Sequence, residues 1–167
     1  MQLRRATPDD HARAGEVTVA AYADFTLGPA DPYVSRLRDA ATRDREAELW
    51  VATPDDRDDE ILGCVTLCPP GSPWRELSGP DEGEFRMLAV APEARGQGVG
   101  EALARMCLDR FRSERRRGVV ICSLPEMTDA HRLYGRLGFR RAPELDWSPL
   151  DGVRLHGYRI DFEESQG

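Results

Sequence analysis

A glycine-rich stretch past the middle of the chain has residue types and a spacing suited to binding phosphate. Its members are Arg95, Gly96, Gln97, Gly98 and Gly100. An apolar run from Glu84 to Val90 ends before it, and a strongly helical pattern begins after it. Glycines let the backbone approach a ligand and adopt positive φ without a steric penalty. Because the first N–H groups of a helix lack intrahelical partners and lie at the positive end of its dipole, this stretch predicts a phosphate or pyrophosphate site.

Two other phosphate-binding motifs are excluded by the neighbouring residues. A P-loop requires Lys-Ser or Lys-Thr after its last glycine, whereas Gly100 is followed by Glu101 and Ala102. A dinucleotide fingerprint has the pattern G-x-G-x-x-G in an early βαβ unit. The glycines here have a different spacing and lie past the middle of the chain.

The remaining pattern is Arg-x-x-Gly-x-Gly, formed by Arg95, Gly98 and Gly100. It resembles the signature of the GNAT superfamily, the acetyl-CoA-dependent N-acetyltransferases. A second block, from Leu133 to Phe139, resembles the late helix of that family and its exit. The separation between the two blocks is typical of the family. Without the resemblance, the first block is only a strand-turn-helix junction and the second only an amphipathic helix with a glycine cap.

The resemblance implies the fold class α/β (α+β), with helices packed on a central sheet. The expected GNAT fold is a mixed, mostly antiparallel sheet of about seven strands flanked by about four helices. We expect a single domain over residues 1–167, because a chain of this length is large enough to bury one core.

The reaction that the resemblance implies is acyl transfer from acetyl-CoA to a primary amine, without a metal. The backbone N–H groups that would hold the pyrophosphate are those of Arg95, Gly96, Gln97, Gly98, Val99 and Gly100. The N–H of Leu88 would stabilise the oxyanion of the thioester, at a point where the central strand diverges from its neighbour. The backbone from Leu88 through Ala89 to Val90 would pair with pantetheine like an added strand. Direct attack in a ternary complex is expected, because no cysteine or serine lies in a nucleophile motif.

Tyr134 lies where many members of the family have a tyrosine that acts as the general acid and contacts the cofactor. A phenol, with a pKa of about 10, is suited to protonating a departing thiolate. The alternative is that Tyr134 only fills the core beside Leu133 and Leu137.

Glu84 is the predicted general base, acting through water on the amine. It precedes Leu88 by four residues, so alternation along a strand would place both side chains on one face. Three other acids compete for this role: Glu82, Asp81 and Glu76. Glu84 is alternatively a charge that faces solvent or a loop.

The elements that must position these residues follow from periodicity. A first strand, Gln2 to Ala6, is followed by a helix that Thr7 and Asp10 would cap, and a second helix is expected near Tyr33 to Arg43. Further expected strands are Glu48–Thr53 and Ile61–Cys68 as a hairpin, Glu84–Val90, Val119–Leu124 and Val153–Phe162. One helix follows the glycine turn, and another carries Tyr134 and ends at Gly138.

The acceptor pocket is expected in three variable regions. These are residues 22–33, the loop around Trp74, and residues 144–156. Asp24, Asp31 and Asp146 are candidates for holding a cationic amine. We favour a small-molecule amine over a peptide N-terminus or a protein lysine, because nothing indicates a groove for a long basic peptide.

Composition limits the partners. The net charge of −7 argues against a nucleic-acid partner, and no apolar run approaches the ~20 residues of a membrane span. The N-terminus lacks a signal-peptide core. Cys64 and Cys68 would lie too far apart on a strand for a disulfide, and no cysteine pair has zinc-site spacing, so a cytoplasmic protein is expected. A homodimer is left open. The rival function is a non-catalytic acyl-CoA-binding or regulatory module.

Overall fold

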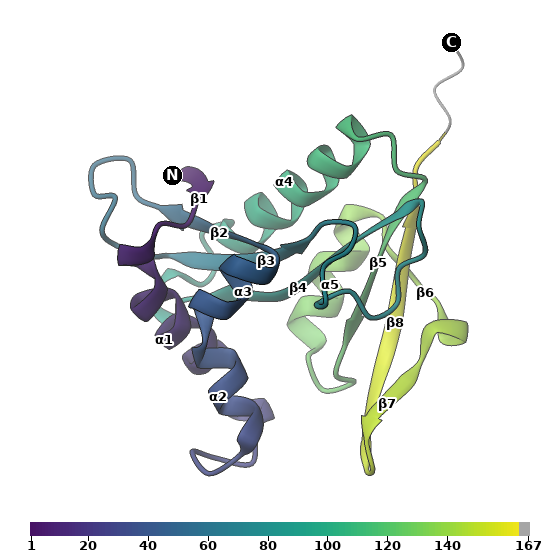
Figure 1. Ribbon diagram of the computed structural model, residues 1–167, viewed down its shortest axis with the longest axis horizontal. Helices are drawn as coiled ribbons and strands as arrows, with labels where there is room; N and C mark the ends of the chain where they lie inside the picture. Colours follow the sequence, from purple (N-terminus) through teal and green to yellow (C-terminus); the bar gives the residue numbers. More distant parts are fainter. Residues whose placement is uncertain (164–167) are drawn as a thin grey trace.

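One mixed β-sheet runs through the molecule, with helices on both of its faces (Figure 1). The computed structural model describes residues 1–163. The strand order is β1-β2-β3-β4-β5-β8-β6, with β7 paired to β8. The strands are β1 (Gln2–Arg5), β2 (Glu48–Thr53), β3 (Gly63–Cys68), β4 (Glu82–Val90), β5 (Gly118–Ser123), β6 (Arg140–Arg141), β7 (Trp147–Leu150) and β8 (Val153–Asp161). Only β4 and β5 pair in parallel within the described residues, which confirms the mostly antiparallel sheet.

The helices divide between the two faces of the sheet. They are α1 (His11–Tyr22), α2 (Pro32–Arg38), α3 (Ala40–Glu46), α4 (Val99–Ser113) and α5 (Thr128–Leu137). Cys64 of β3 lies 3.2 Å from the Thr18 hydroxyl of α1. A Cβ added to the neighbouring Gly63 would instead meet Val99 and Leu103 of α4. Because successive strand residues face opposite sides, α1 and α4 cover opposite faces.

The single helix expected near Tyr33 to Arg43 is wrong. Two short helices, α2 and α3, replace it, because Asp39 leaves the helical conformation (φ −80°, ψ 67°). Its carboxylate accepts hydrogen bonds from the backbone N–H and the hydroxyl of Thr42, and so caps α3. The capping box of Thr7 and Asp10 at the first helix is confirmed.

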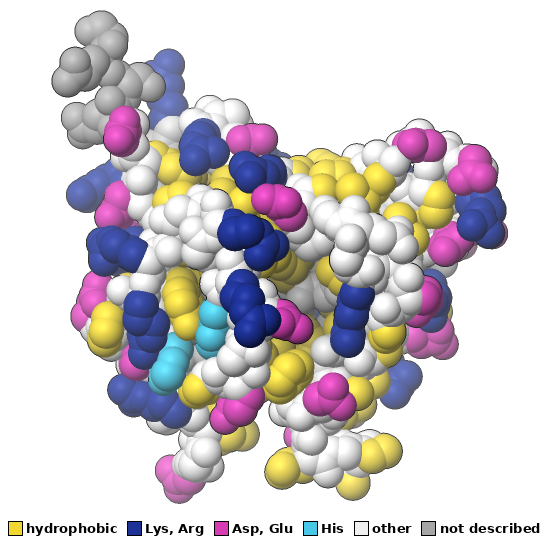
Figure 2. Space-filling model, turned by 180° about the vertical axis from the view of Figure 1, so that it is seen from behind, with side chains coloured by type: hydrophobic (Ala, Val, Ile, Leu, Met, Phe, Trp, Pro, Cys, Tyr) yellow, Lys and Arg dark blue, Asp and Glu magenta, His cyan; other side chains and the backbone are white. Residues whose placement is uncertain are grey.

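Two segments project beyond the sheet in the same direction. They are the loop between α1 and α2 and the hairpin of β7 and β8 (Figure 1). The view from behind shows the surface hollowed between these two projections (Figure 2). Leu27 in the first and Leu150 in the second are 94% and 69% exposed. None of the helices in residues 1–163 is long and apolar enough to cross a bilayer.

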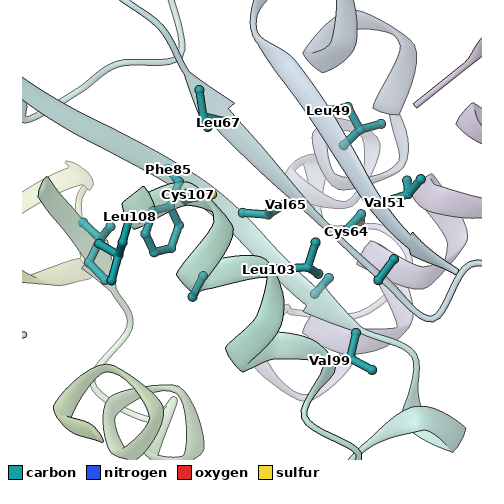
Figure 3. Close-up of a cluster of buried hydrophobic side chains, with 14 of the residues drawn as sticks. Leu49, Val51, Cys64, Val65, Leu67, Phe85, Val99, Leu103, Cys107 and Leu108 are labelled. Atoms are coloured by element: carbon teal, nitrogen blue, oxygen red, sulfur yellow. The ribbon is translucent and has the colours of Figure 1, made fainter. Parts of the chain in front are cut away.

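The core lies largely where α4 packs on β3 and β4. Val65, Phe85, Leu103 and Cys107 meet there, all nearly or fully buried (Figure 3). Burial in this cluster fixes α4 on the sheet and thereby fixes the place of the turn at its N-terminus. The same packing positions the edge of β4 along which β5 runs in parallel.

Candidate active site

The sheet opens between β4 and β5. These strands pair only at Glu82–Gly118, Gly83–Val119 and Glu84–Val120, and beyond that point each continues without the other. A cavity of about 40 Å³ lies in the opening. Its lining includes Tyr22, Arg86, Leu88, Cys122, Ser123 and Tyr134. Because Tyr22 comes from α1 and Tyr134 from α5, the opening is lined from both faces of the sheet.

A β-bulge in β4 marks the start of this opening. Cys64 of β3 pairs with Ala89, and Thr66 with Arg86, so β4 carries one residue more than β3 in this interval. Met87 adopts a left-handed conformation with φ 51°. A bulge bends its strand and interrupts the ladder, as the predicted divergence beside Leu88 requires.

The bulge corrects one expectation about the site. Glu84 pairs with Cys68, and Ala89 with Cys64, so Glu84 and Ala89 face the same side as these two cysteines. Leu88, next to Ala89, therefore faces the other side. The predicted shared face of Glu84 and Leu88 is wrong, because the extra residue shifts the alternation between them.

The glycine turn has the geometry that anion binding requires. Gly96 (φ 77°) and Gly98 (φ 80°) are left-handed, and Gly98 is the N-cap of α4. Within residues 1–163, the backbone N–H groups from Gly96 to Gly100 donate to no side chain and to no carbonyl oxygen outside the helix. The side chain of Arg95 is exposed and forms no ion pair with any described residue. A row of unpaired N–H groups at a helix N-terminus is suited to a phosphate group.

Tyr134 of α5 stands beside the opening with its hydroxyl group unused by the protein. The residue is 7% exposed, and its ring packs against Phe139 (5.7 Å), Tyr158 (6.0 Å) and Phe85 (6.4 Å). No described residue forms a hydrogen bond to its hydroxyl, which is not sealed from solvent. Burial raises the pKa of Tyr134 well above its usual range, so the phenol keeps its proton.

The Glu84 carboxylate is occupied by the loop before β4. It is 1% exposed and accepts hydrogen bonds from the backbone N–H groups of Glu76, Leu77 and Ser78, at 2.9–3.2 Å. Glu84 therefore holds this loop against the sheet. The structure gives the carboxylate this anchoring role, and its role as a base remains a prediction.

The competing acids lie in different surroundings. Glu82 accepts a hydrogen bond from the N–H of Gly79 and pairs with Arg159 at 3.1 Å, at the paired end of β4. Glu76 pairs instead with Arg86, at 2.8 Å, and Arg86 lines the opening. Burial raises the pKa of Glu76, and the charge of Arg86 opposes this shift. Of the acids weighed from the sequence, Glu76 is the one tied to a residue of the cavity wall.

Two of the three carboxylates expected to hold an amine, those of Asp31 and Asp146, form hydrogen bonds within the protein, whereas Asp24 is exposed. Asp31 accepts hydrogen bonds from the N–H groups of Leu27 and Tyr33, and so caps α2. Asp146 forms two 2.6 Å hydrogen bonds with Arg141. Sequence reasoning missed Arg86. The available signal was a lone arginine within a strand whose neighbours, Phe85 and Met87, are apolar.

Comparisons with known proteins point to one family. A model of the acetyltransferase (GNAT) family matches residues 16–139. The mycothiol acetyltransferase of Cellulomonas flavigena is 34% identical over 134 residues, which are 75% of this chain and 38% of that protein. The chain thus spans less than half the length of this relative.

Two solved structures share the fold. The structure of smu.2055 from Streptococcus mutans UA159 has a TM-score of 0.74 at 23% identity, with 98% of this chain and 100% of that chain covered. The putative acetyltransferase yncA of Salmonella typhimurium, solved with its cofactor acetyl-CoA, has a TM-score of 0.67 at 18% identity, with 99% and 97% covered. At these identities the likeness concerns the fold alone.

Proposed function

The chain belongs to the acetyltransferase (GNAT) family, and on that premise we propose that it transfers an acetyl group from acetyl-CoA to the primary amine of a small molecule. One observation carries the proposal. The sheet opens between β4 and β5 beside a helix N-terminus with unpaired N–H groups, and the hydroxyl of Tyr134 is unused beside the opening. These parts correspond to a site for a phosphate-bearing acyl carrier and a proton donor.

Acetyl-CoA would lie across the start of α4 and the free edge of β4. The N–H groups from Gly96 to Gly100 would hold its pyrophosphate. The N–H of Arg95, which was predicted with them, donates instead to the carbonyl oxygen of Pro92 at 3.4 Å. The backbone of Leu88, Ala89 and Val90 would pair with the pantetheine amides in place of the missing neighbour strand. The thioester carbonyl would then meet the N–H of Leu88 at the bulge, where the strand no longer follows the regular ladder. No metal is needed for this arrangement.

The chemical step is a direct displacement. The neutral amine nitrogen attacks the thioester carbon, and the negative charge that develops on the carbonyl oxygen is stabilised by the N–H of Leu88. The C–S bond then breaks, the Tyr134 hydroxyl gives its proton to the thiolate, and the amide and CoA are formed. Cys122 also lines the opening, but burial raises the pKa of its thiol to about 11. A thiol in this state is a poor nucleophile near neutral pH, which favours direct attack over an acyl-enzyme.

The proton of the amine would go to a carboxylate, through water or directly. Glu84 is the base predicted from the sequence. Because the loop occupies its carboxylate, Glu84 would take the proton through a water molecule. Glu76 is the competitor that the geometry favours, because it lies against Arg86 at the cavity wall. One test distinguishes the two residues: the pH dependence of the reaction rate in their glutamine variants.

An acceptor panel with acetyl-CoA tests the proposal. The release of free thiol from acetyl-CoA is measured with small amines, peptides that have a free N-terminus, and a lysine-containing protein. Release that depends on a small amine supports the proposed function. Release only with peptides or proteins makes the chain a peptide or protein N-acetyltransferase, and CoA binding without any release makes it a non-catalytic module. The cysteines, all of them free, fit the reducing cytoplasm that we propose as its compartment.

A further inference from the structure

The strongest unexplained feature is a charged pair of which one member, Arg86, lines the opening. Arg86 of β4 has a side chain only 11% exposed and pairs with Glu76, which is 20% exposed. Burying such a pair costs desolvation free energy that the attraction between the charges often fails to recover. Glu84 already anchors the loop that carries Glu76, so the pair is not needed for that purpose.

One part of the Arg86 guanidinium is held rigidly by its neighbours. Its Nη1 group lies 2.8 Å from Glu76 and donates to the carbonyl oxygen of Trp74 at 3.3 Å. The guanidinium carbon lies 5.6 Å from the centre of the Trp74 ring, and that ring is fixed by a 2.9 Å hydrogen bond from its Nε1 to Glu46. A guanidinium fixed in this way loses little freedom when it binds a ligand.

The other part of the guanidinium is unused. The Nε and Nη2 groups of Arg86 donate to no acceptor among residues 1–163, and neither is sealed from solvent. Arg86 lines the cavity, so a ligand bound there is the candidate acceptor for these two donors. The planar fork of a guanidinium matches a carboxylate group in shape and charge.

We propose that the acceptor is a free α-amino acid or a close analogue, whose carboxylate binds Arg86 while its amino group lies at Glu76. The inference rests on the proposed function and names the substrate class of that site. An α-amino acid carries opposite charges side by side, as do Arg86 and Glu76. Arg86 lies two residues before Leu88, so an acceptor bound there presents its amine close to the thioester site.

The test compares acceptors that differ only at the carboxylate. In one series leucine, leucinamide and isoamylamine are offered with saturating acetyl-CoA, and in another phenylalanine, phenylalaninamide and phenethylamine. We expect kcat/KM for each free amino acid to exceed that for its amide and its amine by about 10-fold or more, since a charge-assisted contact is lost in both. The amide contains a less basic amine than the free amino acid and is more readily deprotonated, so a preference for the amino acid over its amide cannot come from amine reactivity.

Substitutions test whether Arg86 causes the preference for free amino acids. Arg86→Met should lower kcat/KM for the free amino acid by about 10- to 100-fold and thereby remove most of its advantage over the amide and the simple amine. Arg36→Met is the control, because Arg36 also stacks on Trp74, at 4.8 Å, but does not line the cavity. It should keep the wild-type preference.

The outcomes separate the two proposals. Equal turnover of amino acids, amides and amines by the wild type overturns the inference and leaves the proposed function intact. No thiol release with any acceptor overturns the proposed function, and the inference with it. If Arg86→Met does not fold, the wild-type comparison still decides, because it needs no variant.

Discussion

Gly98 is a left-handed residue in the turn that would hold the pyrophosphate. Its φ is 80°, and a Cβ added there would have no atom within 4 Å, so there is space for a side chain. Asp tolerates the left-handed region better than most residues. Gly98→Asp should therefore fold, yet it would place a negative charge against the pyrophosphate. We expect CoA affinity to fall by ~10²-fold or more in a calorimetric titration.

Gly152→Asp is the control for this change. Gly152 has a φ of 79° and equally open surroundings, but lies in the β7–β8 hairpin. The Gly152→Asp variant should bind CoA with wild-type affinity. Unchanged affinity in a folded Gly98→Asp protein would remove the pyrophosphate from this turn.

Tyr134→Phe keeps the ring and removes only the hydroxyl group. The ring packs on Phe85, Phe139 and Tyr158, so the fold should be retained. Turnover should fall by ~10²-fold or more, the scale of a lost general acid, while the affinity for acetyl-CoA changes little. Steady-state kinetics with any accepted amine measure this. Tyr158→Phe, a neighbouring tyrosine outside the cavity lining, should retain near-normal turnover. Wild-type turnover in Tyr134→Phe would make Tyr134 a core residue only.

The glutamine variants of Glu84 and Glu76 separate the two candidates for the base. Removal of the base should depress the rate most at low pH, where few amines are already neutral, and raising the pH should restore part of it. The variant whose rate–pH profile shows this change identifies the base. Glu84→Gln should also loosen the loop at Glu76, since its amide nitrogen cannot accept the Glu76 N–H that one carboxylate oxygen accepts at 3.0 Å. Two profiles that superimpose on the wild-type profile would leave the proton to Glu82, Asp81 or bulk water.

At the scale of elements, local signals were sufficient wherever the chain follows regular periodicity. The capping box at Thr7, the glycine turn before α4 and the left-handed Gly138 after α5 were all predictable from residue type and spacing. The bulge was not, because Met87 carries no glycine signal for its positive φ. Its position depends on pairing with β3, which is a tertiary contact.

The contact between α1 and α2 is close enough to require a glycine. A Cβ on Gly15 of α1 would overlap the backbone carbonyl of Arg38, at the end of α2. Gly15→Ala should lower the free energy of unfolding by ~1–3 kcal/mol, because backbone must move. In α5, a Cβ on Gly135 would meet no atom within 4 Å, so Gly135→Ala should be neutral or stabilise by up to about 1 kcal/mol. Urea denaturation of both variants measures the difference, and equal values would contradict the close approach of α1 and α2.

At the scale of the molecule, several buried or paired carboxylates link stability to pH. Arg4 lowers the pKa of Asp10, and Arg141 lowers the pKa of Asp146. A carboxyl group with a depressed folded-state pKa adds stability above its unfolded pKa of about 3.9, and this stability is lost as the pH falls through the folded value. The free energy of unfolding should therefore fall as the pH drops below about 4.

Asp10→Asn tests the linkage. It should lose stability near neutral pH and show a shallower decline in acid than the wild type, by urea denaturation at a series of pH values. Asp129→Asn, at a side chain that is 95% exposed, should follow the wild-type curve. A decline as steep in Asp10→Asn as in the wild type would assign the acid sensitivity to other groups.

The whole site could be predicted from sequence only in part. The donor side is contained in one continuous stretch, from β4 through the turn to α4, and its order is visible in the chain. The acceptor side brings together Arg86 from β4, its partner Glu76 from the preceding loop, and Tyr22 from α1. Contacts between such distant segments have no local signature, so the pairing of Arg86 with Glu76 was not predicted.

Product analysis tests the central claim most directly. Acetyl-CoA and an accepted small amine are incubated with the chain, and free CoA and the N-acetylated amine are quantified together by mass spectrometry. Direct transfer predicts that the two products form in equal amounts, only when both substrates are present, and without a burst of CoA before the amine is added. CoA bound at the turn without any acetylated amine across the panel would contradict the assignment of this chain as an N-acetyltransferase of small molecules.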